Sequence, residues 1–238
     1  PNFRFPVNPK PSQRRMPIKT SKPASSRKSK PVEKRRRLSA SERELQILTG
    51  AIKFFSERGL DGQTRDLAKE IGITHPLLYH YFPTKKALIE RVYQEVYLGR
   101  WKTQWEQWLD DETMALEEKL IRFYQDYAHA ILTPEWVRIF IFSGLNDGDI
   151  PNKYLLLLKK KLFPRILRET RAYLGNTKPH PESERELQLI LGLHGGIFYL
   201  GIQQWVYNED PPKDIDQVIR DRVRAYIASA QELFGRAP

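Results

Sequence analysis

Histidine, tyrosine and leucine side chains are concentrated in one short segment near residue 75, where their chemistry suits contact with DNA. A helix is predicted there after a tight turn at Gly72, with Thr74 as its N-cap and Pro76 in its first turn. Leu78 and Phe82 are four residues apart and should face the core. The residues left facing outward are His75, Pro76, Leu77, Tyr79, His80 and Tyr81. Imidazoles can donate or accept at base edges, leucine can touch a thymine methyl group, and tyrosine hydroxyls suit phosphate oxygens or base edges.

Two earlier helices must hold this segment in place. Overlapping Ser-x-x-Glu capping boxes at 39–42 and 41–44 predict a first helix that ends at Gly59. Thr64 is predicted to cap a short second helix over 65–71. Two short helices joined by a tight turn predict a helix-turn-helix, whose second helix enters the major groove of DNA. An amphipathic hairpin packed on another helix is the structural alternative.

Two runs of sequence carry a family resemblance: TRDLAKEIGI over Thr64–Ile73 and LYHYFPTKKAL over Leu78–Leu88. Together they resemble the DNA-binding head of the TetR family of transcriptional regulators, specifically over about residues 42–92. The resemblance implies phosphate contacts from Thr64, Tyr79 and Lys85, and contacts to operator bases from His75, Leu77, His80 and Tyr81. Lys85 also begins a predicted helix whose N-terminal amides attract a phosphate. Gln63 departs from the family pattern, in which a threonine pair is common.

Helical periodicity continues to the end of the chain, and no segment alternates with the period of a strand, so the predicted fold is all α with about nine helices. A long fourth helix should start at Lys85 and run past Trp108. Five more are predicted over about 112–131, 134–145, 151–174, 181–207 and 214–234. Pro164 should kink or interrupt its helix. We predict a basic arm over 1–37, a helix-turn-helix domain over 38–84 and a helical ligand-binding and dimerisation domain over 85–238.

The body beyond residue 100 resembles the family in layout only, with a pocket inside it and two C-terminal helices that pair across a two-fold axis. Apolar and aromatic side chains predicted to line a ligand pocket are Trp101, Trp105, Trp108, Tyr124, Tyr127, Trp136, Phe140 and Phe198, with His129, Arg138 or His194 as polar anchors. An ordinary core is the alternative. Residues predicted at a dimer interface are Leu191, His194, Ile197, Val218, Val223 and Tyr226, beside glycines 192, 195 and 196. An internal core of one chain is again the alternative.

The excess of positive over negative charge lies at one end of the sequence. The chain has 238 residues and a net charge of +11, but residues 1–40 alone contain thirteen lysines or arginines and one acid. Such a proline-rich basic segment is expected to be disordered by itself and to bind a polyanion, although a solubilising or cloning-derived tail is the alternative. No apolar run is long enough for a membrane span, and no export signal is evident, so a cytoplasmic location is expected.

Enzymatic chemistry finds no support in the residue pattern. There is no cysteine, the five histidines lack the spacing of metal ligands, and no glycine-rich phosphate loop is present. We therefore predict a non-enzymatic, homodimeric regulator that needs no metal or cofactor and binds a double-stranded DNA operator. The expected mode is a repressor released by a small-molecule ligand of unknown identity. The alternative is a ligand-independent architectural DNA-binding protein with the same fold.

Overall fold

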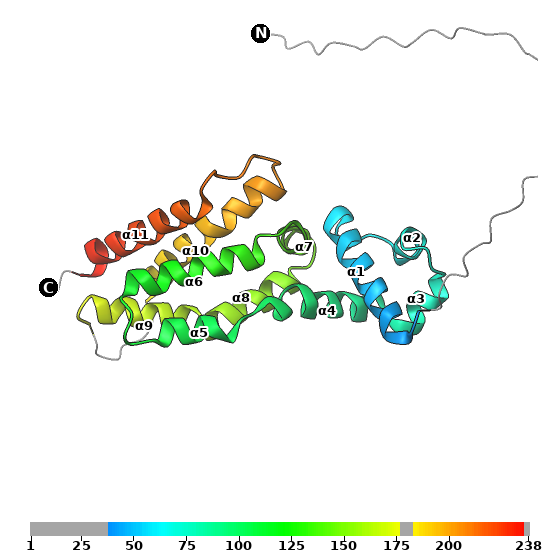
Figure 1. Cartoon of the computed structure of the whole chain (residues 1–238), viewed down its shortest axis with the longest axis horizontal. Coiled ribbons are helices and arrows are strands. Elements are labelled where there is room, and N and C mark those ends of the chain that lie inside the picture. Colours follow the sequence, from blue (N-terminus) through cyan, green and yellow to red (C-terminus); the bar gives the residue numbers. More distant parts are fainter. Residues whose placement is uncertain (1–37, 177–182, 236–238) are drawn as a thin grey trace, which may run out of the picture. The chain divides into compact units, whose positions relative to one another are not determined.

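The computed structural model describes residues 38–176 and 183–235, which fold into helices without a strand (Figure 1). The predicted all-α fold is therefore confirmed, whereas the predicted basic arm lies outside the described residues. The helices are α1 Ala40–Arg58, α2 Thr64–Glu70, α3 His75–Tyr81, α4 Lys85–Val96, the short 3-10 helix η1 Leu98–Arg100, α5 Thr103–Asp110, α6 Leu116–Ile131, α7 Pro134–Leu145, α8 Asp149–Lys161, α9 Phe163–Tyr173, α10 Glu184–Trp205 and α11 Ile215–Phe234. None of these helices is long and apolar enough to cross a membrane.

Helix α1 begins at the first of the two predicted capping boxes. The Glu42 amide donates to the Ser39 hydroxyl over 3.2 Å, and the Ser39 amide donates to the Glu42 carboxylate over 2.7 Å. The second predicted box is not used, because Ser41 already lies inside the helix. The helix ends at Gly59, whose φ of 79° is accessible to glycine at low cost.

The first three helices pack closely around one apolar core. Its fully buried members are Ile47, Leu48, Ala51, Phe54, Phe55, Leu67, Ala68 and Leu78. Close packing explains a glycine within α1: a Cβ on Gly50 would come within 2.2 Å of the Ile71 side chain. Helix α4 adds Leu88 and Val92 to the same core and leads on toward the rest of the chain.

The predicted long fourth helix is interrupted between α4 and α5. Tyr97 is buried, and its hydroxyl donates to the Trp136 carbonyl of α7 over 2.9 Å. Trp101 and Lys102 then have extended backbones, so α5 starts in a new direction at Thr103. A second division falls at Pro164, which lies in the first turn of α9, as the sequence led us to expect. If α4 and α5 are counted as one predicted helix, and α8 and α9 as another, the described residues contain the nine predicted helices.

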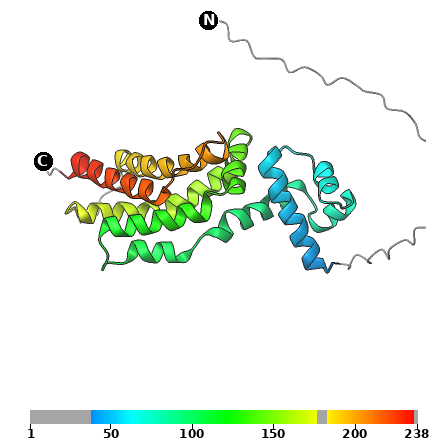
Figure 2. The same cartoon turned by 45° about the horizontal axis from the view of Figure 1, so that its top comes forward.

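Helices α5 to α11 form the body. Helices α10 and α11 lie side by side in both views, and both contact α6 (Figures 1 and 2). Arg171 of α9 and Glu186 of α10 form a two-pronged ion pair, with N–O distances of 2.8 and 2.7 Å. This ion pair holds the pKa of the largely buried Glu186 carboxyl at about 2, well below its usual range.

Candidate nucleic-acid interface and the body behind it

The turn between α2 and α3 has the geometry of a helix-turn-helix. Gly72 has a φ of 71°, and the Ile73 amide donates to the Ala68 carbonyl over 2.9 Å. Thr74 caps α3, because its hydroxyl accepts from the Leu77 amide over 3.3 Å. Leu78 has no exposed surface, which fixes the opposite side of α3 as the face open to a partner.

The open face of α3 carries the side chains that the sequence singled out. Thr74, Pro76 and His80 are exposed, whereas His75, Leu77, Tyr79 and Tyr81 are partly buried. The His80 and Tyr81 rings contact each other edge to face, with centroids 5.4 Å apart. The His75 and Tyr79 rings do the same at 4.8 Å. Two histidines and two tyrosines are thus gathered on one short helix, each held by a neighbouring ring.

Thr64 differs from its predicted role at the start of α2. The N-cap is Gln63, without a side-chain cap bond, and Thr64 is the first residue inside the helix. Its side chain is largely buried, and its hydroxyl lies 3.0 Å from His75 Nε2 and 3.1 Å from the Tyr79 hydroxyl. The predicted cap is therefore wrong, because this hydroxyl contacts α3 instead. Nothing in the local spacing pairs residues 64 and 75, so this contact could not be predicted from the sequence.

Lys85 lies at the start of α4, where Thr84 caps the helix by accepting from the Ala87 amide over 3.0 Å. Neither Lys85 nor its exposed neighbour Lys86 forms an ion pair within the described ranges. Both lysines line a groove of about 570 Å³ whose other wall includes residues of the α7–α8 loop. Asp61, Glu90, Asp147 and Asp149 line the same groove, so the groove as a whole is not positive. An anion contact would therefore be confined to the two lysines beside the N-terminus of α4.

The body contains a large cluster of aromatic rings. Trp105, Tyr124, Tyr127 and Trp136 are buried in it, and Phe140 stacks on Trp136 with centroids 5.0 Å apart. Phe198 contacts both Trp136 and Phe140. The structure therefore brings together six of the predicted pocket residues. It adds aromatic residues that the sequence analysis did not single out, namely Tyr97, Tyr154 and Phe163.

The other two predicted tryptophans lie at the margin of this cluster. Trp101 contacts Trp105 edge to face and donates its ring N–H to Glu106 over 3.1 Å. Trp108 lines a surface groove of about 820 Å³, and the Arg122 guanidinium lies 4.4 Å from its ring centroid. Helical spacing placed the three tryptophans on one stripe, but the body covers only part of that stripe.

Several polar atoms are enclosed by the aromatic cluster. The Tyr127 hydroxyl lies 2.8 Å from the Tyr154 hydroxyl and 3.3 Å from His194 Nε2. In the part of the chain that the structure describes, the Tyr124 hydroxyl, Trp136 Nε1 and His194 Nδ1 have no hydrogen-bond partner. Burial lowers the pKa of His194 to about 4, so its ring is neutral at physiological pH. Buried donors and acceptors without partners cost about 1 to 3 kcal/mol each, which favours the entry of a partner.

Two of the three predicted polar anchors lie elsewhere. His129 is exposed, and its Nε2 lies 2.9 Å from an Asp216 carboxylate oxygen. Arg138 donates to the Ser56 carbonyl over 2.6 Å and to the Trp205 carbonyl over 3.3 Å. These carbonyls lie in the last turns of α1 and α10, so one guanidinium joins the negative ends of two helices. His194 alone lies among the aromatic rings.

The residues predicted at a dimer interface mostly face inward. Ile197 and Val223 have no exposed surface, and His194 and Tyr226 are nearly as buried, so one chain's own core contains these side chains. Leu191 and Val218 are partly buried. Helices α10 and α11 nevertheless have an open side. A groove of about 330 Å³ runs along it, lined by Gln188, Leu189, Gly192, Gly196, Arg222, Ala225 and Ser229 among others.

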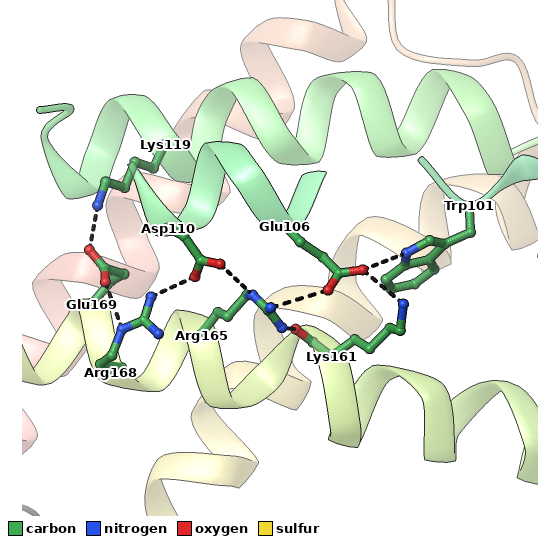
Figure 3. Close-up of polar contacts among 8 residues, drawn as sticks. All are labelled: Trp101, Glu106, Asp110, Lys119, Lys161, Arg165, Arg168 and Glu169. Atoms are coloured by element: carbon green, nitrogen blue, oxygen red, sulfur yellow. Dashed lines mark hydrogen bonds and ion pairs between the residues drawn. The ribbon is translucent and has the colours of Figure 1, made fainter. Parts of the chain in front are cut away.

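A ladder of ion pairs joins α5 to α8, α9 and α6 (Figure 3). Its members alternate in charge and are Lys161, Glu106, Arg165, Asp110, Arg168, Glu169 and Lys119. Asp110 accepts from Arg165 over 3.0 Å and from Arg168 over 2.7 Å. The ladder ends at the buried Lys119, which pairs with Glu169. It fixes α5, the first helix of the body, to the end of α8 and to α9. Among the described residues no group of three acids or histidines could hold a metal ion.

Comparisons with known proteins agree with this geometry. Residues 47–92 match the sequence model of the family described as bacterial regulatory proteins, tetR family. The described fold is similar to that of a TetR-like transcriptional regulator from Rhodococcus sp. RHA1, at 15% identity and a TM-score of 0.62, covering 81% of this chain and 99% of that one. It is also similar to the TetR family regulator PfmR from Thermus thermophilus, at 21% identity and a TM-score of 0.55, covering 76% and 97%.

A third similar structure is that of the fatty acid degradation regulator FadR from Bacillus halodurans, at 16% identity and a TM-score of 0.59, covering 81% of this chain and 97% of that one. No curated protein matches the sequence significantly. The α2–α3 geometry is that of a helix-turn-helix, and the described helices share the fold of these regulators. Residues 47–92 therefore match the head of the TetR family, and the described residues have the fold of TetR-family transcriptional regulators.

Proposed function

We propose that this chain acts as a homodimeric repressor that binds a pseudo-palindromic operator through α3 and leaves it when a small molecule enters the body. The observation that carries the proposal is the open face of α3, where His75, Leu77, His80 and Tyr81 stand around a helix anchored by the buried Leu78. Thr74 and Pro76 begin that face. Two such helices would enter successive major grooves about 34 to 36 Å apart.

Phosphate contacts are proposed for Tyr79, which lies between the base-facing residues of α3, and for Lys85 at the start of α4. Lys85→Ala should weaken operator binding equally on all operator variants, because a phosphate contact carries no base code. It should also reduce the slope of log K against log salt by about two units per dimer, at about 0.9 for each neutralised phosphate. Lys159→Ala, an exposed lysine at the end of α8, is the matched control. Fluorescence anisotropy on a selected operator measures both the affinity and the salt slope. An unchanged slope for Lys85→Ala would show that Lys85 does not contact a phosphate.

The dimer is proposed to form on the open side of α10 and α11. Among the described residues, a Cβ added to Gly192 would meet no other helix within 4 Å, which leaves room for the close approach of a second copy. Ala225→Glu, in the groove, should therefore yield monomers that bind the operator weakly. Ala228→Glu, at another exposed alanine of α11, is the control. Sedimentation that gives the same dimer for both variants would move the interface elsewhere.

The ligand is proposed to bind within the aromatic cluster of the body. Support comes from the Tyr124 hydroxyl, Trp136 Nε1 and His194 Nδ1, which find no hydrogen-bond partner within the described part of the chain. Because the side chains around these atoms are neutral aromatic groups, an uncharged aromatic molecule is the fitting class. It must bind the operator-free conformation more tightly, since equal affinity for both conformations shifts nothing.

Ligand-induced release can be tested with a collection of uncharged aromatic compounds. Each compound is added to the dimer on a fluorescent operator, and release of the operator is measured. Release by a compound that Trp136→Leu abolishes supports the site, whereas release that survives this substitution would place the ligand elsewhere. Operator binding that no compound alters would favour the ligand-independent architectural protein.

The same assay at several salt concentrations tests the basic arm. If it contributes three phosphate contacts per subunit, deletion of 1–37 should flatten the slope of the dimer by about five units.

A further inference from the structure

The buried hydroxyl of Thr64 contacts two side chains of α3, His75 and Tyr79. His75 is proposed to read a base, and Tyr79 is proposed to bind a phosphate. The Thr64 hydroxyl lies 3.0 Å from His75 Nε2 and 3.1 Å from the Tyr79 hydroxyl. His75 and Tyr79 are one helical turn apart and touch edge to face, so all three groups form one compact unit. Thr64 itself is 8% exposed, which makes its hydroxyl a poor direct contact for a phosphate.

Counting protons limits how this unit can be arranged. A threonine hydroxyl donates one hydrogen bond and accepts up to two, a tyrosine hydroxyl donates one, and a neutral histidine carries one ring N–H. Phosphate oxygens only accept. If Tyr79 donates its proton to a phosphate, Thr64 must donate to the Tyr79 oxygen. Thr64 can then contact His75 only as an acceptor, so the single proton of His75 sits on Nε2.

We propose that Thr64 is a positioning residue that sets the hydrogen-bonding sense of His75. In this relay His75 Nε2 donates to Thr64, Thr64 donates to Tyr79, and Tyr79 donates to a phosphate, which leaves His75 Nδ1 as an acceptor facing the major groove. The donors that bases present there are the exocyclic amines of adenine and cytosine. His75 therefore selects adenine or cytosine over guanine and thymine. The inference rests on the proposed binding of operator DNA through α3.

Base analogues in a selected operator test the relay on the full-length dimer. The base that His75 reads is the one at which His75→Ala loses its preference. If that base is adenine, its replacement by purine, which lacks the amine, should weaken wild-type binding about tenfold, the effect of one hydrogen bond. Replacement by 7-deazaadenine, which keeps the amine and loses N7, should leave binding unchanged. If it is cytosine, pyrimidin-2-one removes the amine in the same way.

Variants at Thr64 separate positioning from a direct contact. Thr64→Val has nearly the same shape without the hydroxyl, and it should lose the tenfold discrimination while the salt slope stays that of the wild type. Thr64→Ser keeps the hydroxyl and should restore the discrimination. Thermal unfolding followed by circular dichroism confirms that both variants are folded.

Three results would overturn the relay: selection of guanine or thymine at this position, a loss with 7-deazaadenine instead of purine, or full discrimination by Thr64→Val. The first two would mean that His75 donates, and the third that His75 reads the base without the Thr64 hydroxyl. Failure of the proposed function is a separate result, because the wild-type dimer would then select no operator sequence at all.

Discussion

The buried His194 should make the stability of the body depend on pH. Its pKa is about 4 in the folded chain, against an ordinary value of 6.5, because burial disfavours the charged ring. The neutral ring therefore stabilises the fold fully above pH 6.5, and this contribution is lost as the pH falls toward 4. Each pKa unit corresponds to about 1.36 kcal/mol, so the free energy of unfolding should fall by about 2 kcal/mol between pH 7 and 5 and by about 3 kcal/mol by pH 4.

Urea unfolding followed by circular dichroism, at fixed protein concentration and at several pH values, measures this loss. His194→Phe removes the titrating group and should flatten the curve between pH 6.5 and 4, whatever its effect on stability at pH 7. His129→Phe is the control, because His129 is exposed and its Nε2 lies 2.9 Å from Asp216, with no ring contact to the aromatic cluster among the described residues. Parallel curves for the wild type and His194→Phe would refute the reasoning, since protonation of His194 would then cost nothing in the folded chain.

Three further outcomes concern stability. Leu78→Ala should destabilise the head by about 2 to 5 kcal/mol through a core cavity, measured by urea unfolding; a loss below about 1 kcal/mol would contradict the packing of α3. Because Arg171, and to a smaller extent Ser183, lowers the pKa of Glu186 to about 2, the wild type should lose up to about 3 kcal/mol as the pH falls from 4.5 toward 2, and Arg171→Met should lose clearly less. Arg138→Met should free two helix-end carbonyls and speed hydrogen exchange in the last turn of α1; unchanged exchange would show that this bridge does not stabilise the helix end.

Local signals in the sequence determined most helix boundaries. The capping box of Ser39 and Glu42, the caps Thr74 and Thr84, and Pro164 each act within a few residues, so their effect can be predicted without knowing what packs against them. The helix-turn-helix follows from the same kind of information. Its turn needs a glycine at a positive φ, and its second helix needs an apolar side opposite an open one.

Tertiary structure alone decided the contacts between distant residues. The break after α4 falls at Tyr97, whose hydroxyl donates to the Trp136 carbonyl, 39 positions away in the sequence. Likewise, a stripe of apolar residues on α10 does not reveal which side faces the chain's own core; the structure shows that Ile197 does. Thr64 gives the clearest case. Its hydroxyl could cap α2 or meet α3, and only the fold of the turn brings His75 within 3.0 Å of it. Periodicity defines a face of a helix, whereas the partner of that face is set by how the helices pack.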